Sequence, residues 1–326
     1  MPNLATSYMR LRLRNPIIVA SCGLTNSVEK IAACEEAGAG AVVVKSLFEE
    51  VLAQEDWGLS QSAPYHPEAL DYLNAELQLQ YGPNDYCDLI SEAKKRVKIP
   101  VIASINCISA KWWAEFAAKI ENAGADALEL NIFSVPTDPK KNSNDLESVY
   151  YNVLETVKSR IKIPVAMKIG RNFTSPLYLI SQLDKRGLDA VVMFNRFTEP
   201  DIDIHKLKMK TTFSFSKGDE INNLLRWVAI TSDKVNCDIS ATTGIHSAES
   251  IIKLILGGAS TVQLASVLYK NGLGAIKEML DEISTWMSTY HLDEMHEFKG
   301  RVGFSPDYEP EVYLRAQFME KIRGIE

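Results

Sequence analysis

The chain has 326 residues, of which 46% are hydrophobic and 24% are charged, a balance typical of a globular protein with a large core. Its 42 Asp and Glu residues outnumber its 35 Lys and Arg residues, and the net charge is −7. This balance argues against nucleic acid as a partner, since a nucleic-acid-binding protein carries a basic surface. No apolar run approaches the roughly 20 residues of a membrane span, so we expect no membrane partner either.

The N-terminal segment MPNLATSYMRLRLRNP has charged residues where a signal peptide needs an apolar core, which predicts a cytoplasmic protein. His291 and His296 are five residues apart and would not share one face of a helix, so they do not form a metal pair. The cysteines contain no C-x-x-C pair, which argues against zinc or an iron–sulfur cluster, and we expect no metal and reduced thiols. They are Cys22, Cys34, Cys87, Cys107 and Cys237.

Eight short runs rich in β-branched and other apolar residues recur along the chain. Each is nearly continuous in its hydrophobicity, as expected for strands that are buried on both faces of a parallel sheet. The runs cover residues 16–21, 41–46, 100–106, 127–133, 164–170, 190–196, 238–245 and 261–266.

Helical patterns lie between most of these runs, at residues 27–38, 109–124 and 247–258 among others, and each begins at Ser and ends at Gly. Eight strands alternating with helices predict a (β/α)₈ TIM barrel. A doubly wound sheet is the alternative, although six strands would suit it better. Two long intervals, at about 47–99 and 197–237, are interpreted as excursions over the catalytic mouth of a single domain that spans residues 1–326.

Polar residues stand at the ends of the predicted strands, where barrel enzymes carry their active sites. Two of these residues are lysines, and lysine is rarely buried without a partner. Taken alone, each lysine has an ordinary alternative, which is to extend its ammonium group to solvent. Together with three strand-end asparagines, they indicate a site for an anion or an electron-rich ring. The strand-end residues are Ser21, Lys45, Asn106, Asn131, Lys168, Asn195, Thr243 and Ser266.

Thr243 and Gly244 form a turn of small residues that leads into the helix predicted from Ser247. Helix N-termini that follow such turns bind phosphate groups through backbone N–H groups. Many βα turns look alike, so the turn alone is a weak signal. Its position on the seventh strand, next to residues 264–266 on the eighth, is where barrels commonly hold phosphate.

These motifs resemble the dihydroorotate dehydrogenase family, and in particular its soluble, FMN-dependent branch. The resemblance covers nearly the whole chain and rests on the order and spacing of the motifs. They are NPIIVASCGLT (15–25), AGAGAVVVKSL (37–47), GADALELNIFS (124–134), IPVAMKI (163–169), SATTGIHSAE (240–249), GGASTVQLAS (257–266) and EFKGR (297–301).

The resemblance implies an FMN oxidoreductase of pyrimidine biosynthesis that oxidises dihydroorotate to orotate. It implies that Lys168 lies by the N1–O2 edge of the flavin and that Lys45 lies between the flavin and the substrate. It also implies that Asn131 and Asn195, together with Lys45, contact the substrate. Arg196 departs from the family pattern and is a further candidate, because its guanidinium could bind a substrate carboxylate. The remaining FMN contacts that the resemblance implies, alongside Asn131 and Asn195, are Ala20, Ser21, Ser46, Asn106, Ser216, Thr243, Gly244, Ala265 and Ser266.

The resemblance places a catalytic base on the loop after the fourth strand, at the position of Ser134. There the base would remove a carbon-bound proton while hydride passes to flavin N5, and Lys45 would assist. A serine base needs help, because an unassisted hydroxyl is a poor proton acceptor near neutral pH. The soluble branch carries Cys at this position. Its members are often dimers, so a homodimer is expected. A redox partner that accepts the electrons is a further possibility that the sequence leaves open.

The chain departs from the family pattern on the substrate side. Phe133 and Val135 flank Ser134, and Arg196 follows Asn195 where the family has Ser. Residues 62–74, SAPYHPEALDYLN, replace the family's substrate loop. The alternatives are therefore a flavin oxidoreductase with another substrate or a redox partner, and a non-redox phosphate-binding lyase. The lyase would use Lys168 or Lys45 as a Schiff-base amine.

Overall fold

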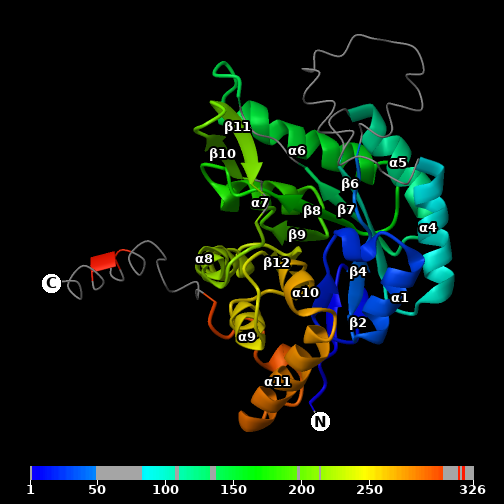
Figure 1. Cartoon of the computed structure of the whole chain (residues 1–326), viewed down its shortest axis with the longest axis vertical. Coiled ribbons are helices and arrows are strands. Elements are labelled where there is room, and N and C mark those ends of the chain that lie inside the picture. Colours follow the sequence, from blue (N-terminus) through cyan, green and yellow to red (C-terminus); the bar gives the residue numbers. More distant parts are fainter. Residues whose placement is uncertain are drawn as a thin grey trace.

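A computed structural model describes residues 2–48, 83–106, 110–132, 137–196, 199–212 and 214–303, with residues 315, 318 and 319. Several sequence predictions fall outside these residues, among them the predicted base Ser134 and the loop at 62–74. The described chain forms one body of strands surrounded by helices (Figure 1).

Eight parallel strands form a closed barrel in which neighbours in the ring are also neighbours in the sequence. The ring closes where β4 pairs with β6, with Val42 opposite Val101 and Val43 opposite Ile102. Every predicted apolar run forms one of these strands, which confirms the (β/α)₈ barrel and excludes the doubly wound sheet. The strands are β3 (Ile17–Val19), β4 (Ala41–Val43), β6 (Val101–Asn106), β7 (Ala127–Asn131), β8 (Val165–Ile169), β9 (Ala190–Met193), β12 (Asp238–Thr242) and β13 (Thr261–Leu264).

Helices cover the outside of the barrel and connect the strands. The three helices predicted from Ser and Gly signals are present, and two begin at a serine cap: Ser27 accepts from the N–H of Lys30 and Ser247 from that of Ser250. The helices are α1 (Val28–Glu36), α4 (Pro83–Arg96), α5 (Ala110–Asn122), α6 (Ser143–Lys158), α7 (Pro176–Lys185), α8 (Ile221–Ser232), α9 (Ala248–Leu256), α10 (Ser266–Asn271) and α11 (Ala275–Thr289).

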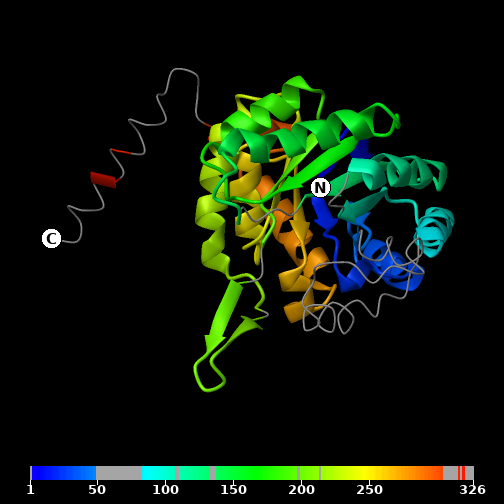
Figure 2. The ribbon, with the colours of Figure 1, turned by 90° about the horizontal axis from the view of Figure 1, so that it is seen from above.

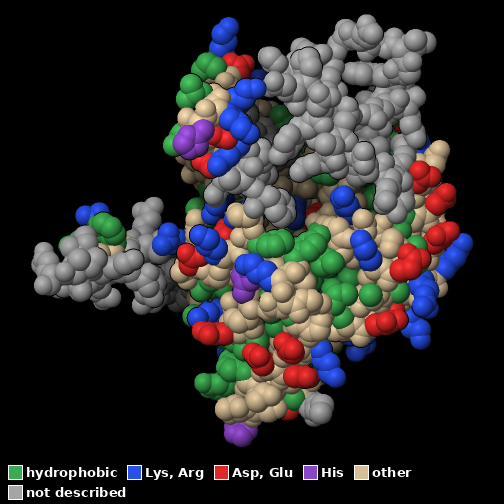
Figure 3. Space-filling model, viewed as in Figure 1, with side chains coloured by type: hydrophobic (Ala, Val, Ile, Leu, Met, Phe, Trp, Pro, Cys, Tyr) green, Lys and Arg blue, Asp and Glu red, His purple; other side chains and the backbone are tan. Residues whose placement is uncertain are grey.

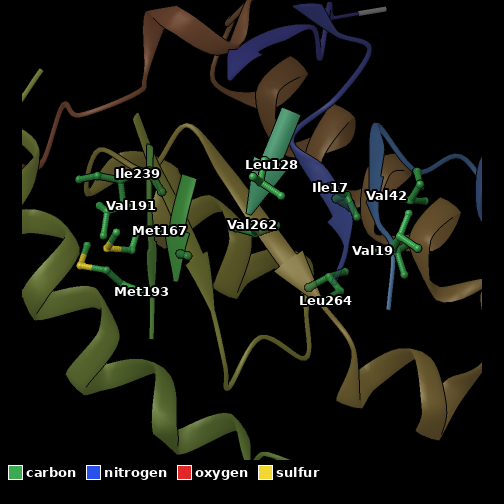
Figure 4. Packing of buried hydrophobic residues seen from close by; sticks show 14 of the residues in the cluster. Ile17, Val19, Val42, Leu128, Met167, Val191, Met193, Ile239, Val262 and Leu264 are labelled. Atoms are coloured by element: carbon green, nitrogen blue, oxygen red, sulfur yellow. The ribbon is translucent and has the colours of Figure 1, made fainter. Parts of the chain in front are cut away.

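The larger hydrophobic cluster lies between the strands and these helices. Alternate residues of each strand enter it, because successive side chains point to opposite faces of a strand. Figure 4 shows part of this layer, where Met167, Met193 and Ile239 from three adjacent strands lie close together. The layer holds the strand order and therefore the relative positions of the strand ends.

The amino-terminal end of the barrel is closed by a hairpin of β1 (Thr6–Tyr8) and β2 (Leu11–Leu13). Tyr8, Met9 and Leu13 pack with small inward-facing residues from the first positions of the strands, such as Ala127 and Ala166. The closed bottom leaves the opposite end, where the strands finish, as the open end of the barrel.

The described parts of the two long intervals contain regular elements. Helix α4 occupies the second half of the first interval and packs on α1 and β6, while α8 occupies the end of the second. A two-residue strand, β5 (Leu47–Phe48), follows β4 and pairs with β6. A hairpin of β10 (Glu199–Asp203) and β11 (Lys208–Thr212) fills the start of the second interval and extends away from the barrel (Figure 2).

Positive and negative side chains are interspersed over the face drawn in Figure 3, as the composition suggests. None of the helices in the described ranges is both long enough and apolar enough to cross a membrane.

Asp238, the first residue of β12, ties the closing hairpin to the barrel. It accepts hydrogen bonds from the Met9 N–H at 2.8 Å and the Ser260 hydroxyl at 2.6 Å, and Lys299 Nζ lies 3.8 Å away. Asp238→Ala should lower the free energy of unfolding by roughly 1–3 kcal/mol, because it leaves polar partners unsatisfied. Urea unfolding measures this loss, and Asp281→Ala on the exposed face of α11 is the control. Equal stability of the two variants would contradict this role for Asp238.

Candidate functional site

A pocket opens at the carboxyl ends of the barrel strands, where the sequence places the site. It encloses about 540 Å³ of empty space, including its open mouth. Most predicted site residues line it, although they come from strands that lie far apart in the sequence. The lining contains the predicted Ala20, Ser21, Lys168, Asn195, Arg196, Ser216, Thr243, Gly244, Ala265 and Ser266, and also Phe194, Thr242, Ile245, Gln263 and Leu264.

One wall of the pocket is the turn after β12. Thr243 and Gly244 have φ values of 84° and 77°, a left-handed conformation that glycine adopts without strain. A Cβ atom on Gly244 would lie 2.7 Å from the backbone nitrogen of Ile221, so the turn has no room for a side chain there. Within the described chain, no protein acceptor takes the N–H of Gly244 or Ile245. Free N–H groups at a tight turn before a helix suit an anion.

A cluster of hydroxyl and basic groups lies beside this turn. The Ser266 hydroxyl accepts from the Ser216 N–H at 3.1 Å, and Ser216 Oγ lies 3.0 Å from His246 Nε2. Lys270 Nζ donates to the Ser216 carbonyl at 3.0 Å. Burial, and then the positive charge of Lys270, lowers the pKa of His246 below its ordinary value. The cluster therefore supplies donors and positive charge at the end of the pocket where phosphate was predicted.

Lys168 lies deep in the pocket and is 9% exposed. It is an inward-facing residue of β8, and its Nζ lies 4.0 Å from Oε1 of Glu129 on the adjacent strand β7. Gln263 on β13 donates to the other carboxylate oxygen of Glu129 at 2.7 Å. The pocket floor thus contains a cation, its counter-charge and an amide.

Asn131 and Asn195 are brought together, as their predicted shared role requires. The Asn195 side-chain amide donates to Asn131 Oδ1 at 2.7 Å, and its backbone N–H donates to the Ile169 carbonyl. Asn131 lies opposite Lys168 in the β7–β8 register. The bond fixes the orientation of the two amides relative to each other at the strand ends.

On the other side of the rim, three serines form a chain of hydroxyls. Ser21 Oγ lies 2.9 Å from Ser46 Oγ, which lies 2.8 Å from Ser104 Oγ. Ser46 therefore orients the hydroxyl of Ser21, and Ser21 lines the pocket. Lys45 is half-buried, and Asn106 ends β6 opposite Phe48. Four of the predicted site residues that the structure describes do not line the pocket. They are Lys45, Ser46, Asn106 and Asn131.

Arg196 lines the pocket, but its guanidinium is already engaged. Its Nε donates to Glu220 at 3.2 Å, Nη2 donates to the Ser214 hydroxyl at 3.1 Å, and Nη1 donates to the Ser214 carbonyl. The guanidinium that was predicted to bind substrate therefore braces the segment before α8.

Several polar residues of the site were not predicted, among them Glu129, Gln263, His246 and Lys270. Glu129 could have been found, because a carboxylate inside the apolar run ALELNIF needs a partner within the barrel. Gln263 gives the same signal in TVQLAS. His246 in the turn before α9 and Lys270 on α10 give no such signal, and only the folded chain brings them together near Ser216. Among the residues that the structure describes, no cluster of His, Cys, Asp or Glu could hold a metal.

Comparison with known proteins agrees with this geometry. A dihydroorotate dehydrogenase catalytic subunit of the B (NAD⁺) type from Thermoplasma volcanium is 26% identical over 317 residues, covering 92% of this chain and 98% of the relative. Its counterpart from Thermoplasma acidophilum is 28% identical, covering 93% and 99%. A third, from Methanocaldococcus jannaschii, is 26% identical, covering 89% and 95%. The family model for dihydroorotate dehydrogenase matches residues 3–287, and the chain therefore belongs to the dihydroorotate dehydrogenase family.

Proposed function

We propose that the protein binds FMN at the strand-end pocket and uses it to oxidise dihydroorotate, or a closely related cyclic anion. Membership of the family makes the chain an oxidoreductase that acts on CH–CH groups. The observation that carries the FMN proposal is the pairing, in one pocket, of a buried lysine with a turn of free backbone N–H groups.

The residues of the pocket fit the two ends of a flavin nucleotide. The turn at Thr243 and Gly244, with Ser266 and Ser216, would hold the phosphate, since N–H groups, hydroxyls and nearby positive charge suit a dianion. Lys168 would hold the electron-rich edge of the ring, because its ammonium favours the anionic reduced form. When bound, FMN would supply the two-electron acceptor that the side chains lack.

Removal of hydrogen across a CH–CH bond takes a proton from one carbon and a hydride from its neighbour. We propose that Ser134 takes the proton, with Lys45 assisting, and that the paired amides of Asn131 and Asn195 orient the substrate ring. The pairing of Arg196 with Glu220 leaves the substrate carboxylate to other groups.

A different substrate on the same flavin site is the second candidate. It is favoured by Arg196, which replaces a family serine and holds Ser214 and Glu220 at the pocket wall. The lyase alternative is disfavoured, because the family to which the chain belongs consists of oxidoreductases that act on CH–CH groups. The names of the relatives support a partner subunit as the route for electrons, and a homodimer of this chain is compatible with that.

The first test is flavin content and turnover. Protein purified, or reconstituted with FMN, should hold about one FMN per chain without a covalent bond, and anaerobic dihydroorotate should bleach the flavin absorbance. Gly244→Ala should lose FMN, because its Cβ would collide with the backbone at Ile221. Gly274→Ala, where an added Cβ meets no neighbouring atom, is the control. The proposal is contradicted if the protein takes up no FMN. If the protein binds FMN but dihydroorotate does not reduce it and another substrate does, the second candidate function is supported.

The second test uses His246 as a reporter of phosphate. In the FMN-free protein the pKa of His246 is lowered by burial and by Lys270. The unfolded chain, in which the histidine pKa is near 6.5, therefore binds more protons than the folded chain at pH values just below that value. In that pH range the free energy of unfolding should rise as pH increases. A phosphate dianion beside Ser216 should raise the pKa again. Titration of the imidazole resonances with and without FMN measures the change, with His246→Gln assigning the signal. An unmoved His246 resonance would place the phosphate elsewhere.

The third test concerns the base. Ser134→Ala should slow flavin reduction by roughly 10²–10⁴-fold, the usual contribution of a positioned general base. Substrate affinity should change little, because a base acts mainly in the transition state. Ser134→Cys should retain activity, and Ser148→Ala on α6 is the control. Stopped-flow absorbance under single-turnover conditions measures the rate of flavin reduction. A wild-type rate in Ser134→Ala would show that another group removes the proton.

A further inference from the structure

Glu129 is a carboxylate enclosed by the barrel itself. It lies on β7 between the inward-facing Ala127 and Asn131 and is 1% exposed. Its neighbours across the barrel interior are Lys168 on β8 and Gln263 on β13. A carboxylate in such a place costs several kcal/mol of lost hydration unless it is paired, so its surroundings must compensate its charge.

The compensation is incomplete in the protein alone. Oε2 of Glu129 accepts from Gln263 at 2.7 Å, whereas Oε1 has no hydrogen-bond partner among the described residues. Lys168 Nζ stands 4.0 Å from Oε1, beyond hydrogen-bond distance but close enough for strong charge interaction in a buried site. Gln263 Oε1 is also without a partner there. The ammonium is therefore held between a carboxylate below and the open pocket above.

The other ionisable groups facing this pair are neutral near physiological pH. Burial is the main cause that raises the pKa of Tyr8 from β1 and of Tyr86 from α4, and the charge of Glu129 adds to both. Burial likewise raises the pKa of Cys22, which follows β3. Lys168 is thus the cation that balances Glu129 in the described interior.

We propose that Glu129, oriented by Gln263, is a positioning residue that holds Lys168 as an ammonium at the pocket floor and offsets part of its charge. On this proposal Glu129 sets the reduction potential of the bound flavin and keeps that potential from following the protonation of Lys168. The inference rests on the proposed FMN site. It adds Glu129 as a residue that sets the flavin reduction potential without touching flavin or substrate.

The sign of the effect follows from the charges. Glu129 and Lys168 together are neutral, so replacing Glu129 by Gln leaves one uncompensated positive charge beside the anionic reduced ring. That charge favours reduction and raises the midpoint potential while Lys168 is protonated. A buried ammonium without a counter-charge loses its proton more readily. As pH rises, the potential of the variant should therefore fall toward that of the double variant Glu129→Gln/Lys168→Met, which carries neither charge.

The experiment compares Glu129→Gln, Glu129→Asp and Lys168→Met with wild type by redox titration from about pH 6 to about pH 9, a range below the ordinary lysine pKa. Near pH 6, Glu129→Gln should bind reduced over oxidised FMN about tenfold better than wild type does, equal to about 30 mV for a two-electron couple. The excess should shrink with rising pH. Glu129→Asp keeps the charge and should restore the wild-type potential.

Two comparisons separate charge from structure. Glu147→Gln is the matched control, because Glu147 is also buried but lies on α6 and bonds Tyr151, and it should leave the potential unchanged. The double variant Glu129→Gln/Lys168→Met carries neither charge, so its difference in potential from wild type should stay constant with pH. Potentials of Glu129→Gln that run parallel to wild type at every pH would overturn the inference, as would a double variant whose difference from wild type changes with pH as that of Glu129→Gln does.

A second readout needs no flavin. Reductive methylation with ¹³C-formaldehyde labels lysines, and the Lys168 signal is identified by its loss in Lys168→Met. In FMN-free protein this signal should titrate at a lower pH in Glu129→Gln than in wild type. Identical titration curves would overturn the inference even if FMN binds, whereas failure of wild type to bind FMN would overturn only the proposed function.

Discussion

The pairing of β4 with β6 is the constraint on which the rest of the structure depends. It joins the second and third strands of the barrel through Val42–Val101 and Val43–Ile102 and so closes a sheet that would otherwise have two free edges. Closure brings the carboxyl ends of all eight strands to one rim. Residues as distant in sequence as Ser21, Lys168 and Ser266 then line a single pocket.

The closed barrel also explains why charge can be buried beneath that pocket. Small residues such as Ala127, Ala166 and Ala190 fill the amino-terminal layer against the β1–β2 hairpin. The layer above is polar, with Glu129, Lys168 and Gln263 converging from three strands. A hydrocarbon layer lies below these polar groups and the open pocket lies above them, so the ammonium of Lys168 has one open direction, which is toward the pocket.

The sequence was sufficient to predict the barrel because each strand is an apolar run between helical patterns, and such runs suit only strands covered on both faces. The strand-end residues followed, since barrel geometry assigns them to the active face. The hydrogen-bond partners of the site residues could not be predicted in this way. The contacts of Glu129 with Gln263 and of His246 with Ser216 depend on barrel register and helix placement, which no local pattern specifies. Arg196 shows the same limit, because its capture by Glu220 requires the turn into α8 to be in place.

The central claim is that this rim is a flavin site built around Lys168 and the turn at Gly244. The most direct measurement is a crystal structure of the protein soaked with FMN. We predict that the phosphate lies against the N–H groups of Gly244 and Ile245, and that the Lys168 ammonium contacts the N1–O2 edge of the ring. A flavin bound away from this rim, or with its phosphate at another turn, would contradict the claim.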